Sequence, residues 1–154
     1  GLLMPLLIML FFGTLDTGQA VLINQKLINA SQTVGDLIGR EESVNEEEVQ
    51  DIVEAGRLSL APYSTEHLGF DIAGIQFMGG PMRPEEMWRV TENMDSGADL
   101  VDNARGLGAD QEGVVGVIAE YLYEPYFSGI FTGPFVMSEV TYARGRNGLY
   151  IPKE

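Results

Sequence analysis

The chain has 154 residues, which is enough for one domain with its own hydrophobic core. Its net charge is −14, from 9 Lys and Arg against 23 Asp and Glu. Such a surface repels nucleic acid and anionic lipid headgroups, which excludes nucleic-acid binding as a function. The absence of Cys excludes disulfides and thiolate metal sites.

The first 38 residues combine a wholly apolar start with a one-sided helical pattern. Residues 2–12 carry no polar side chain. From residue 20 onward, steps of three and four place six apolar residues on one helix face: Ala20, Ile23, Leu27, Ala30, Val34 and Leu37. We therefore expect one long helix, with residues 1–19 as a transmembrane or filament-core segment. Residues 20–154 are expected to form the stalk helix and a soluble α+β domain.

A cleaved signal peptide or the core helix of a soluble protein would also begin with apolar residues. A signal peptide has a basic n-region and a small-residue cleavage site, and here the first basic residue is Lys26. The uncharged segment is too short to span a membrane by itself, because residues 2–15 span roughly 21 Å as a helix against about 30 Å of hydrocarbon. Either the native chain continues upstream of Gly1, or Asp16 lies within the membrane and needs a partner.

The large apolar side chains of residues 2–12 require a cover from outside the chain. Exposing them to water costs of order 1.5–3 kcal/mol each, and the domain's sheet is already used by the stalk face. Lipid, or the apolar helices of neighbouring chains, is the expected cover. The predicted assembly and membrane residues are Leu2, Leu3, Leu6, Leu7, Ile8, Leu10, Phe11 and Phe12.

A second, shorter helix is expected after a break at residues 39–40. Ser43 and Glu46 fit a capping box, and residues 46–48 place three glutamates in the first turn, where the helix dipole favours acids. Val49, Ile52 and Val53 supply an apolar face, and Pro62 stops the helix.

From residue 68 the pattern indicates strands, at 68–77, 87–91, 114–123 and 135–143, with a bulge at Gly74 and a short helix at 98–104. The expected fold is α+β and pilin-like: a long N-terminal helix packed on a roughly four-stranded antiparallel sheet, plus the second helix.

No catalytic, cofactor-binding or metal-binding residue is predicted, so the chain is not expected to be an enzyme. His67 is the only histidine, and a solvated turn residue is its simplest interpretation. The acid-rich residues 95–112 could collect calcium, but their spacing does not match an EF-hand, which favours a surface loop.

An apolar tip is predicted between the last two strands, where loops are usually polar. It carries Tyr126, Phe127, Ile130 and Phe131. Two alternatives stay open. The tip is either a lid folded back on the core or a contact with a partner or a lipid surface.

The N-terminal block at residues 5–13, Pro-Leu-Leu-Ile-Met-Leu-Phe-Phe-Gly, resembles that of TadE-like pseudopilins, the minor pilins of tight-adherence pilus systems. Asp16 and Gly18 stand where that family has an acid-x-Gly, and residues 24–26 where it has a basic step. Further resemblances follow in the family's order, at residues 30–38, 60–64 and 138–146.

The resemblance implies a membrane-anchored, pilin-like structural protein without cofactors. A prepilin peptidase would trim a basic leader, and the helix would lie in the inner membrane, with an extracytoplasmic domain, until it packs with other pilin subunits in a filament. The glutamate that such helices carry near the mature N-terminus would fall just before Gly1. The alternative is an accessory, non-catalytic subunit of a larger membrane complex, anchored by the same helix.

Overall fold

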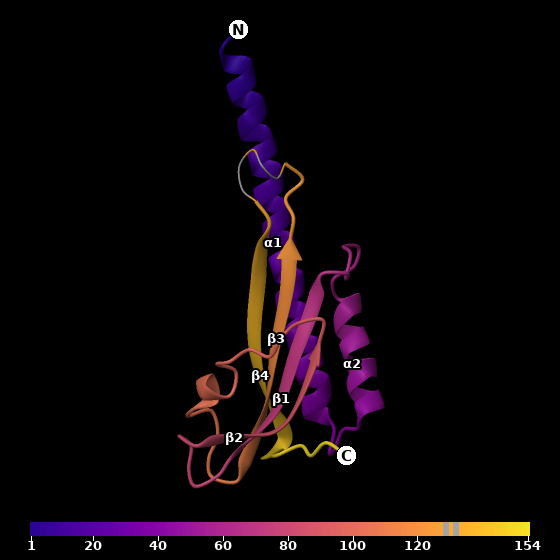
Figure 1. The fold of residues 1–154 in the computed structure, drawn as a ribbon, viewed down its shortest axis with the longest axis vertical. Coiled ribbons are helices and arrows are strands. Elements are labelled where there is room, and N and C mark those ends of the chain that lie inside the picture. The colour runs from indigo at the N-terminus through magenta and orange to yellow at the C-terminus, as the bar shows by residue number, and fades with distance from the viewer. Residues whose placement is uncertain (128–129, 131–132) are drawn as a thin grey trace.

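A computed structural model describes residues 1–127, 130 and 133–154. The expected α+β fold is confirmed: a long helix and a short one accompany a four-stranded sheet in which every neighbouring pair is antiparallel, in the order β2-β1-β3-β4 (Figure 1). The elements are α1 (Leu3–Arg40), α2 (Glu46–Leu58), β1 (Leu68–Phe77), β2 (Pro84–Glu92), the 3-10 turn η1 (Asp102–Ala104), β3 (Glu112–Tyr123) and β4 (Phe135–Leu149).

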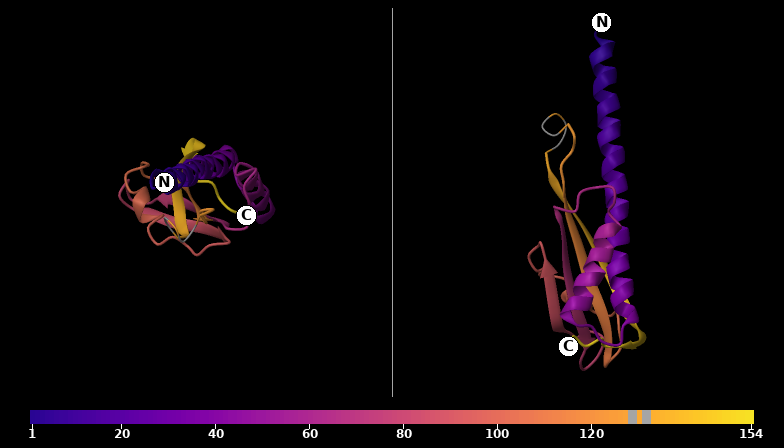
Figure 2. Two further views of the ribbon diagram at one scale, coloured as in Figure 1. Left: turned by 90° about the horizontal axis from the view of Figure 1, so that it is seen from above. Right: turned by 90° about the vertical axis from the view of Figure 1, so that its right-hand side faces the viewer.

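The C-terminal half of α1 packs on the sheet, whereas its N-terminal half projects beyond the domain (Figure 2). The apolar residues buried from α1 are Ile23, Leu27, Ala30, Val34 and Ile38. Ile38, rather than the predicted Leu37, ends this face, because an α-helix advances 3.6 residues per turn and Ile38 continues the row of Leu27, Ser31 and Val34. Leu37 and Ala20 are only half-buried at its margins.

Small residues allow α1 to approach β4 closely. A Cβ on Gly35 would lie 3.4 Å from the Cβ of Ala143, and one on Gly39 would lie 3.0 Å from the carbonyl oxygen of Arg144. Between the same two elements, the hydroxyls of Ser31 and Thr141 are hydrogen-bonded at 2.9 Å. The hydroxyl of the buried Ser31 is therefore satisfied within the chain.

The start of α2 differs from the sequence prediction. The capping box is formed by Asn45 and Glu48, not by Ser43 and Glu46. Val44 is still extended, because it pairs with the C-terminal segment: its N–H donates to Pro152 and its carbonyl accepts from Glu154. The helix therefore cannot begin before Asn45. At its other end it stops at Leu58, before the predicted terminator at Pro62.

Three strands, β2, β3 and β4, extend beyond the expected bounds. The bulge at Gly74 is confirmed by the register shift between Gly74 and Ile75. A Cβ at Gly74 would lie 2.1 Å from the indole nitrogen of Trp88, so the missing side chain makes room for the ring.

The region after β2 contains only the 3-10 turn η1 instead of a helix at 98–104. Two of its acids accept hydrogen bonds from backbone N–H groups: Asp110 from Gly79 in the β1–β2 turn, and Glu112 from Ala109. Asp102 pairs with Arg105. Leu100 and Ala104 are buried against the outer face of the sheet, which ties the segment down without a regular helix. Among the residues that the structure describes, no group of acids and histidines could hold a metal ion.

Candidate assembly surface

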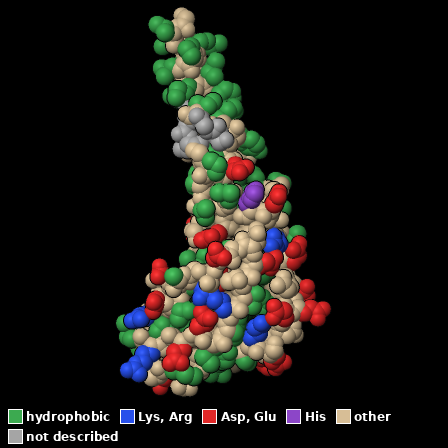
Figure 3. Space-filling model, viewed as in Figure 1, with side chains coloured by type: hydrophobic (Ala, Val, Ile, Leu, Met, Phe, Trp, Pro, Cys, Tyr) green, Lys and Arg blue, Asp and Glu red, His purple; other side chains and the backbone are tan. Residues whose placement is uncertain are grey.

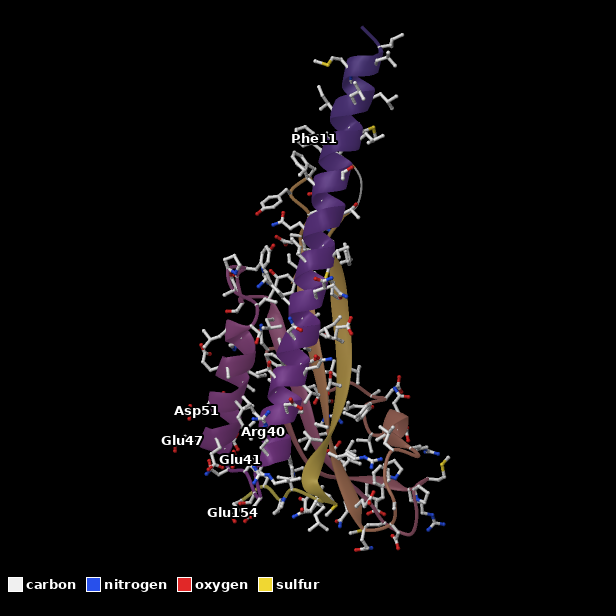
Figure 4. All side chains as sticks on the ribbon, turned by 180° about the vertical axis from the view of Figure 1, so that it is seen from behind. Phe11, Arg40, Glu41, Glu47, Asp51 and Glu154 are labelled. Carbon is white, nitrogen blue, oxygen red and sulfur yellow. The ribbon has the colours of Figure 1, made fainter. Side chains whose placement is uncertain are left out.

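The N-terminal apolar segment, residues 2–12, stands clear of the domain and is covered by almost nothing from its own chain. The exposed fractions of the large side chains from Leu2 to Phe11 range from 91% at Leu2 to 48% at Ile8. Figure 3 shows hydrophobic side chains over the projecting part of α1 and charged side chains over the domain. Of the predicted assembly residues, seven are exposed, namely Leu2, Leu3, Leu6, Leu7, Ile8, Leu10 and Phe11. In Figure 4, Phe11 lies at the end opposite to Arg40, Glu47 and Asp51.

Phe12 is half-buried and differs from the other predicted assembly residues. Its ring lies 4.3 Å, between centroids, from the ring of Phe127 in the β3–β4 connection. One residue of the apolar segment is therefore covered from within the chain.

The exposed apolar surface of α1 continues past the segment that the sequence singled out. Leu15, Val21 and Leu22 are each at least half exposed, on the side of the helix that faces away from the sheet. The sequence prediction placed Leu15 in the membrane or filament-core segment 1–19, but it assigned neither Val21 nor Leu22 to any surface. The i, i+7 spacing of Leu15 and Leu22 is the signal that could have found this outer side.

A shallow groove runs along this helix between the large side chains and four small residues. Its small residues, Gly13, Thr14, Thr17 and Gly18, form two pairs spaced four apart. Both threonine hydroxyls donate to backbone carbonyls one turn back, those of Leu10 and Gly13. The groove is therefore free of unsatisfied hydroxyls, and small residues four apart let helix backbones approach closely.

The aromatic tip, defined by the described residues Tyr126, Phe127 and Ile130, lies beside α1 rather than on the domain core. Tyr126 is 76% exposed and Ile130 is 67% exposed, while Phe127 is half-buried against Phe12. Phe131, the fourth predicted contact residue, lies outside the described residues. The prediction that the tip contacts a partner or lipid thus stays a prediction.

Asp16 joins the tip to the helix in a contact that we call the Asp16 clasp. Its carboxylate Oδ2 accepts from the backbone N–H of Phe127 at 3.3 Å, and its backbone carbonyl accepts from the hydroxyl of Tyr123 at 3.2 Å. Asp16 is only 9% exposed, and its Oδ1 has no partner among the described residues. Burial raises the pKa of Tyr123, and the charge of Asp16 raises it further.

Four tyrosines lie next to the Asp16 clasp, around a cleft that Gln19 and Ile23 also line. They are Tyr63, Tyr121, Tyr123 and Tyr126. Burial raises the pKa of Tyr121 as well. His67 also lines this cleft and is exposed.

The comparisons with known proteins bear on α1. Residues 1–36 match the family described as TadE-like protein. The resemblance drawn from the N-terminal block is confirmed over that stretch, whereas the resemblances at residues 60–64 and 138–146 lie outside it. No curated protein and no solved structure matches the chain.

By length and composition, α1 could cross a membrane. Together with the family match, this helix indicates a pilus-associated, pilin-like protein with an N-terminal membrane anchor. The TadE-like family is a structural, pilin-type family.

Proposed function

We propose that the protein is a membrane-anchored, pilin-like subunit that assembles into, or initiates, a surface filament. Residues 1–19 would be the transmembrane and filament-core part, and residues 20–154 the stalk and extracytoplasmic domain. Before assembly the apolar part of α1 lies in the inner membrane. After assembly it packs against the same part of other subunits, outside the cell.

The observation that carries this proposal is the uncovered surface of the N-terminal apolar segment. Seven large side chains there are at least 48% exposed: Leu2, Leu3, Leu6, Leu7, Ile8, Leu10 and Phe11. Leaving them in water would cost of order 1.5–3 kcal/mol for each side chain. That sum is comparable to or larger than the whole stability of a typical domain, about 5–15 kcal/mol. The sheet cannot supply the cover, since its face is already occupied by the other half of α1.

The groove at Gly13, Thr14, Thr17 and Gly18 favours a helix as the final cover. Lipid tails fill any apolar surface, whereas paired small residues four apart suit the backbone of a second helix. An accessory subunit of a larger complex would use the same groove for a foreign helix. The two functions differ in what copurifies: identical chains in a filament, or other polypeptides at fixed stoichiometry.

Gly18→Ile tests the groove. A Cβ at Gly18 meets no atom within 4 Å, so the larger side chain fits in the isolated subunit. We expect Gly18→Ile to insert into the membrane as the parent does but to lose copurification of two differently tagged copies in mild detergent. Gly18→Ala, which keeps the residue small, should retain it. If Gly18→Ile copurifies as well as the parent, helix packing through this groove is refuted.

A further inference from the structure

We propose that the aromatic tip is a second membrane contact, which inserts into the boundary between acyl chains and headgroups beside α1. The occupant of this surface is a lipid bilayer, on the side facing the domain. The proposal rests on the membrane anchoring proposed above and extends it from a single helix to a helix plus a loop.

The position of the tip favours a contact with the bilayer. The ring contact of Phe127 with Phe12 and the hydrogen bond from Phe127 to Asp16 hold the tip against α1 at the end of the N-terminal apolar segment. On the outer side of α1, Leu15, Val21 and Leu22 keep the helix surface apolar at and below this level. A bilayer whose acyl chains cover the N-terminal apolar segment therefore meets the tip at the boundary between acyl chains and headgroups.

The residue types of the tip also favour a lipid interface. In a chain of net charge −14, no charged residue occurs between Glu124 and Glu139. Tyr126 and Ile130 are exposed and apolar or amphipathic. Tyrosine rings favour the interface, where the ring meets acyl chains and the hydroxyl meets water. Tyr126 and the half-buried Tyr63 line the cleft next to the Asp16 clasp.

The contact between the tip and Asp16 is consistent with a place at the membrane boundary. Asp16 is the only charged residue before Lys26, and an acid near the hydrocarbon needs a partner and protection from lipid. The N–H of Phe127 supplies the partner, and the carboxylate is shielded because Asp16 is only 9% exposed. Within the tip, the N–H of Ile130 donates to the carbonyl of Phe127 at 3.1 Å. Because the interface retains water, it can solvate other loop backbone groups that the hydrocarbon centre could not.

The absence of native Cys allows single-cysteine labelling of the full chain. Tyr126→Cys and Ile130→Cys report on the tip, and Leu7→Cys reports on the anchor. Met82→Cys is the matched control, because Met82 is 62% exposed in the β1–β2 turn, at the opposite end of the sheet. Each variant would carry an environment-sensitive fluorophore and be reconstituted in phosphatidylcholine vesicles. Quenching would be measured with nitroxide-labelled lipid and with aqueous iodide.

We expect labels at 126 and 130 to show blue-shifted emission, strong quenching by a nitroxide near the headgroup end of the acyl chain, and loss of iodide quenching. The label at 82 should show the reverse. Iodide quenching at 126 and 130 equal to that at 82, with the label at 7 buried in lipid, would overturn the tip proposal alone. Protection from both quenchers would mean that protein covers the tip, which also overturns it. A label at 7 that iodide reaches would overturn the membrane anchoring itself.

Discussion

A chain that begins at Gln19 is expected to be a soluble, folded monomer without detergent, whereas the full chain is expected to need detergent or assembly. Removing residues 1–18 deletes the N-terminal apolar segment and its exposed side chains. The first buried apolar residue of α1 is Ile23, so the main core is retained. Size-exclusion chromatography with light scattering, with and without detergent, measures the difference.

A matched control keeps the full length but replaces Leu3, Leu7 and Leu10 by Gln. All three are exposed in the subunit, so the domain should fold as before and the chain should behave like the truncated one. A full-length parent that stays monomeric in plain buffer would contradict the account. So would a shortened chain that still requires detergent.

Asp71→Ala is expected to destabilise the domain by roughly 3–5 kcal/mol, because it leaves the charge of Arg89 without its buried partner. Asp71 is fully buried, and its two carboxylate oxygens accept from Nε and Nη2 of Arg89 at 2.8 and 2.6 Å. The N–H of Gly97 also donates to Asp71, at 2.7 Å. Hydrogen bonding to Asp71 raises the pKa of Arg89, so the guanidinium stays charged throughout the accessible pH range. Urea unfolding of the chain that begins at Gln19 measures the loss.

Asp102→Ala is the control for this comparison. Asp102 also pairs with an arginine, Arg105, but both side chains are more than half exposed. Solvent screening leaves such a pair worth less than about 1 kcal/mol. If Asp71→Ala costs no more than Asp102→Ala, the buried pair does not stabilise the domain as argued.

Local patterns were enough to predict the main elements. The apolar run and the steps of three and four predicted α1, and alternation predicted the buried face of β3. That face carries Val115, Val117, Ala119, Tyr121 and Tyr123, all of which are buried. Gly74 marked its bulge because a strand glycine often accommodates a close neighbour, here Trp88.

The remaining features depend on contacts between residues far apart in the chain. The choice between two possible capping boxes is made by pairing of Val44 with the C-terminal segment. The partner of Asp16 is Phe127, 111 positions later, and no local pattern links the two. The pairing of Asp71 with Arg89 likewise depends on the register between β1 and β2. Sequence reasoning recognised that an acid at position 16 would need a partner, but the fold was required to find it.

The central claim is that the N-terminal apolar segment is covered by other helices once the protein is assembled. A cryo-electron microscopy map of the assembled particle tests it most directly. The account predicts that residues 2–12 lie in the interior, packed against apolar helices of neighbouring chains, with the sheet domain outside. A map in which residues 2–12 face solvent, or in which the sheet domains form the interior, would contradict it.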